Sequence, residues 1–253
     1  MRHFFTILSH EIRALLFNAS TYIAAVLFLL LMAFIFTGIL DSYSKSPQEA
    51  PPAAVFFQLF WIPVWFMVPL LTMRSIAEER RLGTLETLLT AHVSTTEVVL
   101  GKFFAAYIFY IMLWASTLGF YFILQHYARD PRLLDPGPLA GGYLFIAVSG
   151  LLYISVGIFA SSLTRSQAVA AIIACVMLIG LTVGLNYLAT APILSAETFR
   201  HFKPAAESLQ VFRHLDDFTA GVIDTRQIIF YFSGATLALI FSILGVEAKL
   251  LQG

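Results

Sequence analysis

A short charged stretch, residues 77–102, separates two long apolar segments of this sequence. Its charged side chains include Glu78, Glu79, Arg80, Arg81 and Glu86. Acidic and basic groups gathered within a few helical turns suit electrostatic docking into a groove on a soluble partner. An ordinary solvated loop explains the same charges equally well, so the residues by themselves leave both interpretations open.

The apolar residues of this stretch predict a short amphipathic helix. Leu82, Leu85 and Leu89 fall on one helical face, and the charges occupy the others. Gly83 interrupts the middle, where it costs about 1 kcal/mol relative to Ala, and Thr84 can cap a new turn after it. We therefore expect a short, bent unit over residues 76–91.

The composition places this unit in an integral membrane protein. Hydrophobic residues make up 59% of the chain and charged residues only 12%, with a mean hydropathy of +0.83. The formal net charge is zero and no long basic block occurs, so we expect no nucleic acid partner. The single cysteine, Cys175, excludes an internal disulfide and a multi-cysteine metal site.

The hydropathy pattern predicts an all-α integral membrane protein with six transmembrane helices in one domain, residues 1–253. Only a helix satisfies its own backbone polar groups inside a bilayer, and about 20 apolar residues span one. The expected spans are residues 18–40, 54–74, 96–125, 138–163, 166–190 and 226–247. An even number of spans puts both termini on one side. The first apolar run is too long for a signal peptide, so we expect it to be retained.

Two polar segments carry helical apolar spacing and predict amphipathic helices. Before the first span, Phe4, Leu8, Ile12 and Leu15 recur at helical spacing, which suits an N-terminal helix in the membrane interface; the alternative is that these are the first turns of span one. Residues 197–224 repeat apolar side chains mostly every third position, and we expect one or two helices there resting on the membrane face. The residues that carry this second pattern are Phe202, Leu209, Phe212, Leu215 and Phe218, and Pro204 is well placed to begin a helix.

Three spans begin with helix-capping patterns. Ser94–Glu97 precedes span three, Thr164–Gln167 precedes span five, and Asp224–Gln227 precedes span six. Each places an acceptor side chain at the first position and Glu or Gln at the fourth. We expect each to form a capping box or a close variant of one.

No span carries a charged residue near its centre, and His126 lies at a span edge. Ion-coupled pumps and secondary transporters usually keep such a group at depth. The sequence also contains neither HExxH nor GxxxxGK[ST], so we expect no catalytic residue, no bound metal and no ATP hydrolysis by this chain. Any energy for work must come from another protein.

Prolines and glycines in spans two and five mark a possible pathway or dimer contact. Pro63 and Pro69 flank Trp65 and remove backbone donors, which suits a hinge or pathway lining, or simply a tolerated kink. Gly180 and Gly184 in span five form a small-xxx-small pattern that suits close helix packing, either within the chain or with a second copy.

The charged stretch also carries a family resemblance. It resembles the signature of ABC-2 type permeases, the membrane subunits of a class of ATP-binding-cassette exporters, although His92 replaces the usual proline and suggests a looser turn before Ser94. Residues 157–171 are similar to the family's junction between spans four and five, and residues 212–233 resemble the gliding-motility-associated ABC-2 permease subfamily. The signature positions that match are Glu79, Gly83, Thr84, Leu85, Glu86, Leu88, Leu89, Val93, Ser94, Gly101 and Lys102.

This resemblance implies a permease that pairs with a second copy or a homologous permease and sits on two cytoplasmic ATPase subunits. The ATPases would bind ATP and Mg²⁺, and this chain would bind no cofactor. An auxiliary membrane protein with an extracytoplasmic domain is also implied. The residues implied to contact the ATPase are Glu78, Glu79, Arg80, Arg81, Gly83, Thr84, Leu85, Glu86 and Leu89.

The resemblance also implies an orientation that the charges leave open. With both termini inside, eight Lys and Arg residues fall inside and seven outside, so the positive-inside rule barely discriminates. The family implies the bacterial cytoplasmic (inner) membrane, with both termini in the cytoplasm. The expected function is ATP-driven export of a substrate from the cytoplasm or the inner leaflet. The alternative is a mechanotransmission or scaffold subunit that acts on an extracytoplasmic partner without transport.

Overall fold

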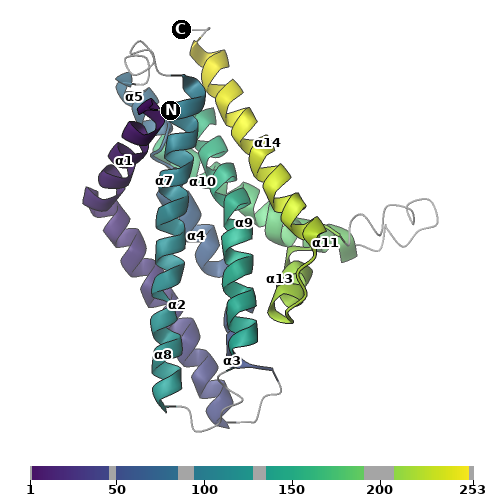
Figure 1. The fold of residues 1–253 in the computed structure, drawn as a ribbon. Helices are drawn as coiled ribbons and strands as arrows, with labels where there is room; N and C mark the ends of the chain where they lie inside the picture. Colours follow the sequence, from purple (N-terminus) through teal and green to yellow (C-terminus); the bar gives the residue numbers. More distant parts are fainter. Residues whose placement is uncertain (1, 46–49, 85–93, 128–134, 191–207, 251–253) are drawn as a thin grey trace, which may run out of the picture.

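The computed structural model describes residues 2–45, 50–84, 94–127, 135–190 and 208–250, and every regular element in these ranges is a helix (Figure 1). The prediction of an all-α fold is therefore confirmed. In chain order the helices are α1 (Arg2–Phe17), α2 (Ala19–Lys45), α3 (Pro52–Gln58), α4 (Trp61–Thr72), α5 (Ala77–Leu82), α7 (Thr95–Ser116), α8 (Leu118–Tyr127), α9 (Pro136–Leu163), α10 (Gln167–Ile179), the π-helix η2 (Gly180–Gly184), α11 (Leu185–Thr190), α13 (Val211–Thr219) and α14 (Thr225–Leu250).

The described part of the chain contains five helical stretches long and apolar enough to cross a membrane. A sixth forms if α3 and the helix after it count as one broken span, which bends by 50°. The multi-pass membrane architecture follows from these stretches. The five unbroken stretches are Ala19–Lys45, Thr95–His126, Pro136–Leu163, Gln167–Thr190 and Thr225–Ala248.

The break in the second span has a local cause. It lies at Leu59 and Phe60, between α3 and α4. Pro63 lies four residues after Leu59. A proline has no N–H to donate to the carbonyl four residues earlier, and its ring clashes with that carbonyl. The Leu59 carbonyl instead accepts from the Ile62 backbone N–H at 3.2 Å. Pro69 lies inside α4 without such a break.

The N-terminal helix is separate from the first span. Asn18 interrupts the chain between α1 and α2, and its Oδ1 accepts from the Ser20 backbone N–H at 3.1 Å, which caps the start of α2. Figure 1 shows α1 and α2 meeting at an angle, with α1 beside α7. Residues 2–17 are thus not the first turns of one continuous span.

One of the three predicted capping boxes forms in full. Ser94 Oγ accepts from the Glu97 backbone N–H at 3.2 Å, and the Glu97 carboxylate accepts from the Ser94 backbone N–H. The Thr164 prediction is wrong, because α10 begins after Ser166 and the Thr164 hydroxyl accepts from the Ser166 N–H instead. Before α14, the Gln227 side chain donates to Asp217 at 2.6 Å rather than reaching back.

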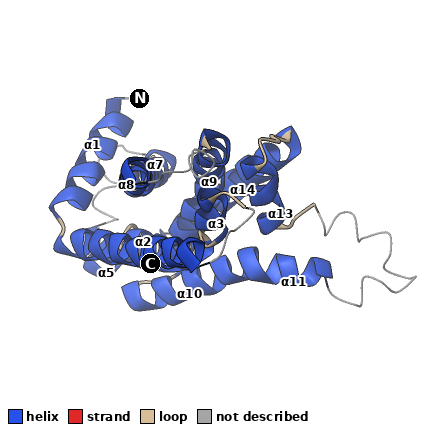
Figure 2. Cartoon of the chain, turned by 90° about the horizontal axis from the view of Figure 1, so that it is seen from below, coloured by secondary structure: helices blue, strands red, loops and turns tan. Residues whose placement is uncertain are grey.

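Helix α13 is buried on one side within the protein. Val211, Leu215 and Phe218 are at most 1% exposed, and α13 packs against α3 and α9, as seen from below in Figure 2. The expectation that this face rests on the membrane is therefore wrong for α13, since aromatic rings such as Phe145 cover it. Pro204 and Phe202 lie outside the described residues.

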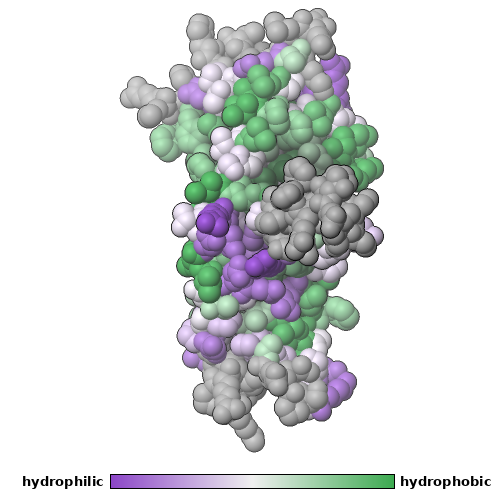
Figure 3. Space-filling model, turned by 90° about the vertical axis from the view of Figure 1, so that its right-hand side faces the viewer, coloured by the Kyte–Doolittle hydropathy of each residue, from purple (hydrophilic) through white to green (hydrophobic). Residues whose placement is uncertain are grey.

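The opposite side of α13 is polar. Figure 3 shows hydrophilic side chains gathered at mid-height of the molecule, below an apolar upper part. Arg213 and Asp216 on α13 and Arg226 at the start of α14 are exposed. α13 therefore joins an apolar core to a charged surface.

Candidate functional site

Helix α5 and the turns around it form the most charged described part of the predicted partner-contact segment. Glu78 and Glu79 stand in its first turn, and Arg80 and Arg81 in its last. Acidic groups at the N-terminus and basic groups at the C-terminus complement the helix dipole and stabilise so short a helix. The sequence thus favours a helix here despite its lack of a side-chain cap.

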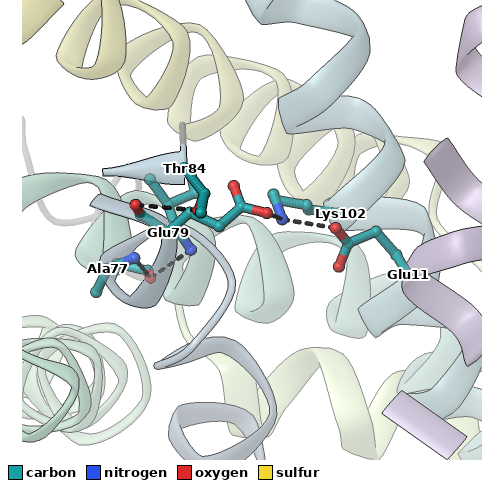
Figure 4. A network of polar contacts seen from close by, with 7 residues as sticks. Glu11, Ala77, Glu79, Thr84 and Lys102 are labelled. Atoms are coloured by element: carbon teal, nitrogen blue, oxygen red, sulfur yellow. Dashed lines mark hydrogen bonds and ion pairs between the residues drawn. The ribbon is translucent and has the colours of Figure 1, made fainter. Parts of the chain in front are cut away.

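Gly83 ends α5 rather than bending its middle. Its backbone has a φ of 71°, in the left-handed region that glycine favours, and its N–H donates to the Glu79 carbonyl. The Thr84 hydroxyl donates to the same carbonyl at 3.3 Å (Figure 4). Leu85, Glu86 and Leu89 lie outside the described residues.

The start of α5 is anchored to the end of α9. The backbone N–H groups of Ile76 and Ala77 both donate to Ser161 Oγ at 3.1 Å. Arg80 Nη1 donates to the Ser162 carbonyl at 2.6 Å. Since Ile76 and Ala77 are fully buried, α5 is fixed to the membrane bundle at its base.

A buried lysine joins α5 to two further helices. Lys102 of α7 has a side chain only 3% exposed, and its Nζ lies 2.7 Å from Glu11 Oε1 of α1 and 2.6 Å from Glu79 Oε1 of α5 (Figure 4). A buried ammonium is tolerated only when paired and hydrogen-bonded. The three side chains, here called the ion triad, thus hold α1, α5 and α7 together.

The close approach of α1 to α7 depends on Gly101. A Cβ at this position would lie 2.7 Å from Ile7 Cγ2 of α1, closer than any real contact. The missing side chain lets α1 pack directly on α7. Because Glu11 lies one turn beyond Ile7, this packing places its carboxylate within reach of Lys102.

The outer side of α5 is open. Arg81, Leu82, Gly83 and Thr84 are exposed, Leu82 by 62% of its surface. Arg81 and Glu78 form a loose ion pair of 3.8 Å at the surface. α5 therefore has an anchored inner side and an exposed charged outer side.

Sequence reasoning left Glu11, Ser161 and the pairing of Lys102 out of the site. Lys102 lies at the start of a long apolar helix, and a charge in that position requires a partner. That signal was present in the sequence, but the partners lie 91 and 23 residues away. No local spacing links α9 to α5.

Of the residues predicted for a pathway or dimer contact, Trp65 contacts η2. Trp65 Nε1 donates to Thr182 Oγ1 at 3.0 Å, which ties α4 to the π-helix. Pro63 and Pro69 are buried within the chain. A Cβ at Gly180 would meet no atom within 4 Å, and one at Gly184 only a carbonyl of its own helix at 3.8 Å. The glycines therefore do not serve close packing within the described chain.

The described residues hold no cluster of three or more His, Cys, Asp or Glu side chains suited to a metal ion. The described site is therefore one of contact and charge. In comparisons with known proteins, the family model described as ABC-2 family transporter protein matches residues 5–248, nearly the whole chain. A search of curated proteins gives no match.

Proposed function

Because the chain belongs to the ABC-2 family of transporter proteins, whose members are membrane components of ABC systems, we propose that it is the permease of an exporter and that α5 with the segment after it contacts a separate cytoplasmic ATPase. The observation that carries this proposal is the ion triad. It ties the exposed helix α5 to α1 and α7 through charge-assisted hydrogen bonds of 2.6 and 2.7 Å. A push on α5 is thereby passed to several helices at once.

The orientation in this proposal has both termini in the cytoplasm of a bacterium and the protein in its inner membrane. The start of α1, the end of α14 and α5 lie at the same end of the molecule (Figure 1). An ATPase-contact helix must face the compartment that contains ATP. ATP and Mg²⁺ are bound by the ATPase partner in this assembly.

A second copy, or a homologous permease, completes the membrane part of the assembly. Gly180 and Gly184 present open space beside η2, and small residues let helices of two chains approach closely. Pro63, Trp65 and Pro69 then lie next to this contact through the Trp65–Thr182 hydrogen bond. A cysteine at Gly180 in a Cys175→Ser background should give disulfide-linked dimers.

We assign the chain to the gliding-motility-associated subfamily on the resemblance of residues 212–233. This assignment adds an auxiliary membrane protein with an extracytoplasmic domain to the assembly. Its contact would be residues 197–224, of which α13 is the described part.

The ATPase contact is tested by co-purification. The full chain is co-expressed with an ABC ATPase from the neighbouring reading frames, and each variant is pulled down. ATPase recovery should fall at least tenfold in a double variant that combines Glu78→Lys with Arg81→Glu. The same loss is expected in the single variant Gly83→Pro. Asp41→Lys combined with Lys45→Glu reverses a more exposed ion pair in α2 and should leave recovery unchanged. Undiminished recovery with the α5 variants would overturn the contact.

A mechanotransmission subunit without transport is the second candidate. Its support is a polar cavity of about 540 Å³ beside α13 and the start of α14, lined by Arg213, Asp217, Asp224 and Arg226 among others. Such a charged cleft suits contact with a polar partner domain. Reconstituted vesicles separate the two functions, because an exporter moves substrate on addition of ATP and a mechanotransmission subunit hydrolyses ATP without any movement.

A further inference from the structure

A second pocket, of about 210 Å³, lies between α1, the start of α2, the end of α4 and α5. One part of its wall is apolar, with Leu15, Leu70 and Leu71. The other part is charged, with Arg74, Glu78 and Glu79. This division matches a molecule with a polar head and an apolar tail.

The charged part of the pocket contains one unused donor and one unused acceptor. Arg74 Nε and Glu79 Oε2 are both buried without a hydrogen-bond partner. The other groups are engaged, since Arg74 Nη1 donates to Asn18 at 3.2 Å and Glu79 Oε1 accepts from Lys102. An unpaired buried polar atom is costly, so a ligand that pairs both atoms would be stabilising. Both side chains are only part-buried, and both residues line the pocket.

The apolar part of the pocket continues into an exposed apolar stripe on the second span. Phe66, Leu70 and Arg74 follow one another at four-residue spacing, so they lie along one side of the second span. Phe66 is 60% exposed and Leu70 is 37% exposed. An acyl chain can lie along these two side chains while its headgroup reaches Arg74. A free anion would leave this apolar stripe uncovered.

The charge of the lining selects the headgroup. Three carboxylates, of Glu11, Glu78 and Glu79, stand against the two cations Arg74 and Lys102, which leaves the lining one negative charge when His10 is neutral. An anionic lipid is therefore disfavoured. The unused acceptor on Glu79 needs an N–H or O–H donor, and a quaternary ammonium has neither.

We propose that this pocket binds a zwitterionic phospholipid with a primary amine, of the phosphatidylethanolamine type. Its phosphate pairs with Arg74, its ammonium with Glu79 and Glu78, and an acyl chain lies on Leu70 and Phe66. The lipid then bridges the interface helix α1 and the base of α5. This inference holds independently of the ATPase contact, because it concerns the permease alone.

The test uses the full-length permease, delipidated in detergent. Four probes are titrated: dihexanoyl phosphatidylethanolamine, phosphatidylcholine and phosphatidylglycerol, and free O-phosphoethanolamine. Binding is followed by native mass spectrometry and by the melting temperature. We expect the phosphatidylethanolamine to bind at least tenfold more tightly than the other three. Equal binding of the phosphatidylglycerol or the phosphatidylcholine would overturn the headgroup assignment, and equal binding of O-phosphoethanolamine would overturn the assignment to a lipid.

Variants locate the site. Arg74→Gln should weaken phosphatidylethanolamine binding at least fivefold, and Glu78→Gln should reduce the preference for it over phosphatidylcholine. Arg165→Gln, at an exposed arginine outside the pocket lining, should change neither. If Arg74→Gln does not fold, Glu78→Gln decides alone. Unchanged binding and preference in the folded pocket variants would overturn the site.

Discussion

Lys102 is the residue on which the proposed transmission of force depends most. Lys102→Met would leave Glu11 and Glu79 side by side without a cation. Removing one partner of a buried ion pair costs roughly 3–5 kcal/mol, and because these carboxylates keep 18% and 25% of their surface exposed, we expect about 3 kcal/mol. Thermal melting of the purified protein measures the loss.

A triple variant separates charge from packing in this experiment. Lys102→Met combined with Glu11→Gln and Glu79→Gln removes the uncompensated charges, so most of the lost stability should return. If the triple variant melts as low as Lys102→Met alone, the lost stability comes from the missing lysine side chain and its contacts, and not from uncompensated charge.

His214 predicts a pH dependence of the α13 packing. It is 3% exposed, its Nδ1 lies 3.1 Å from the Tyr231 hydroxyl, and its Nε2 lies 3.0 Å from the Ser208 carbonyl. Burial lowers the pKa of His214 below its usual value, opposed by the Ser208 carbonyl and by Asp217. The unfolded chain therefore binds the proton more readily than the folded one.

Because the pKa of His214 is lower in the folded protein than in the unfolded chain, its contribution to stability is fully present above the unfolded-state pKa of about 6.5. The contribution is lost as the pH falls through the folded pKa. We expect the melting temperature to fall between pH 7.5 and pH 5, and His214→Gln to flatten that slope, while His126→Gln keeps it. An identical slope in wild type and His214→Gln would assign the pH effect to other groups.

Among helix contacts, that of α1 with α7 is sensitive to a single methyl group at Gly101. In Gly101→Ala the new Cβ meets Ile7 at 2.7 Å, and a β-branched side chain has little rotamer freedom to move aside. We expect a loss of about 1–3 kcal/mol and weaker coupling of ATPase activity, because α1 and Glu11 shift away from Lys102.

The matched control is Gly119→Ala in α8, where the added Cβ meets no atom within 4 Å. It should be neutral in both measurements. Ile7→Ala in the Gly101→Ala background should restore part of the stability by removing the clashing methyl group. Equal melting temperatures for the two single glycine variants would show that α1 does not pack as described.

Local sequence patterns predicted where helices begin better than they predicted which helix faces are buried. The Ser94–Glu97 box could be predicted because both partners lie within one turn. The Thr164 pattern failed because a competing local bond, from the Ser166 N–H to the Thr164 hydroxyl, satisfied the side chain first. The burial of α13 could not be predicted, since the ring of Phe145 that covers Phe218 comes from a helix more than 70 positions earlier in the chain.

For the whole molecule, the hydropathy pattern was sufficient to predict the fold class but not the arrangement of the helices. Long apolar runs permit only helices in a bilayer, so the all-α architecture followed from composition. The placement of α5 between α1, α7 and α9 depends on long-range contacts. The candidate site was thus predicted in its exposed charges and missed in its buried supports, Glu11 and Ser161.

Orientation decides whether α5 can meet an ATPase at all. In a Cys175→Ser background, Arg81→Cys places a thiol on exposed α5, and Val222→Cys places one on the exposed turn after α13. With a membrane-impermeant maleimide, we expect Arg81→Cys to react in inverted membrane vesicles only, and Val222→Cys in right-side-out vesicles only. Labelling of Arg81→Cys in right-side-out vesicles would place α5 away from ATP. The ion triad would then remain as a clamp between helices, with no ATPase for α5 to contact.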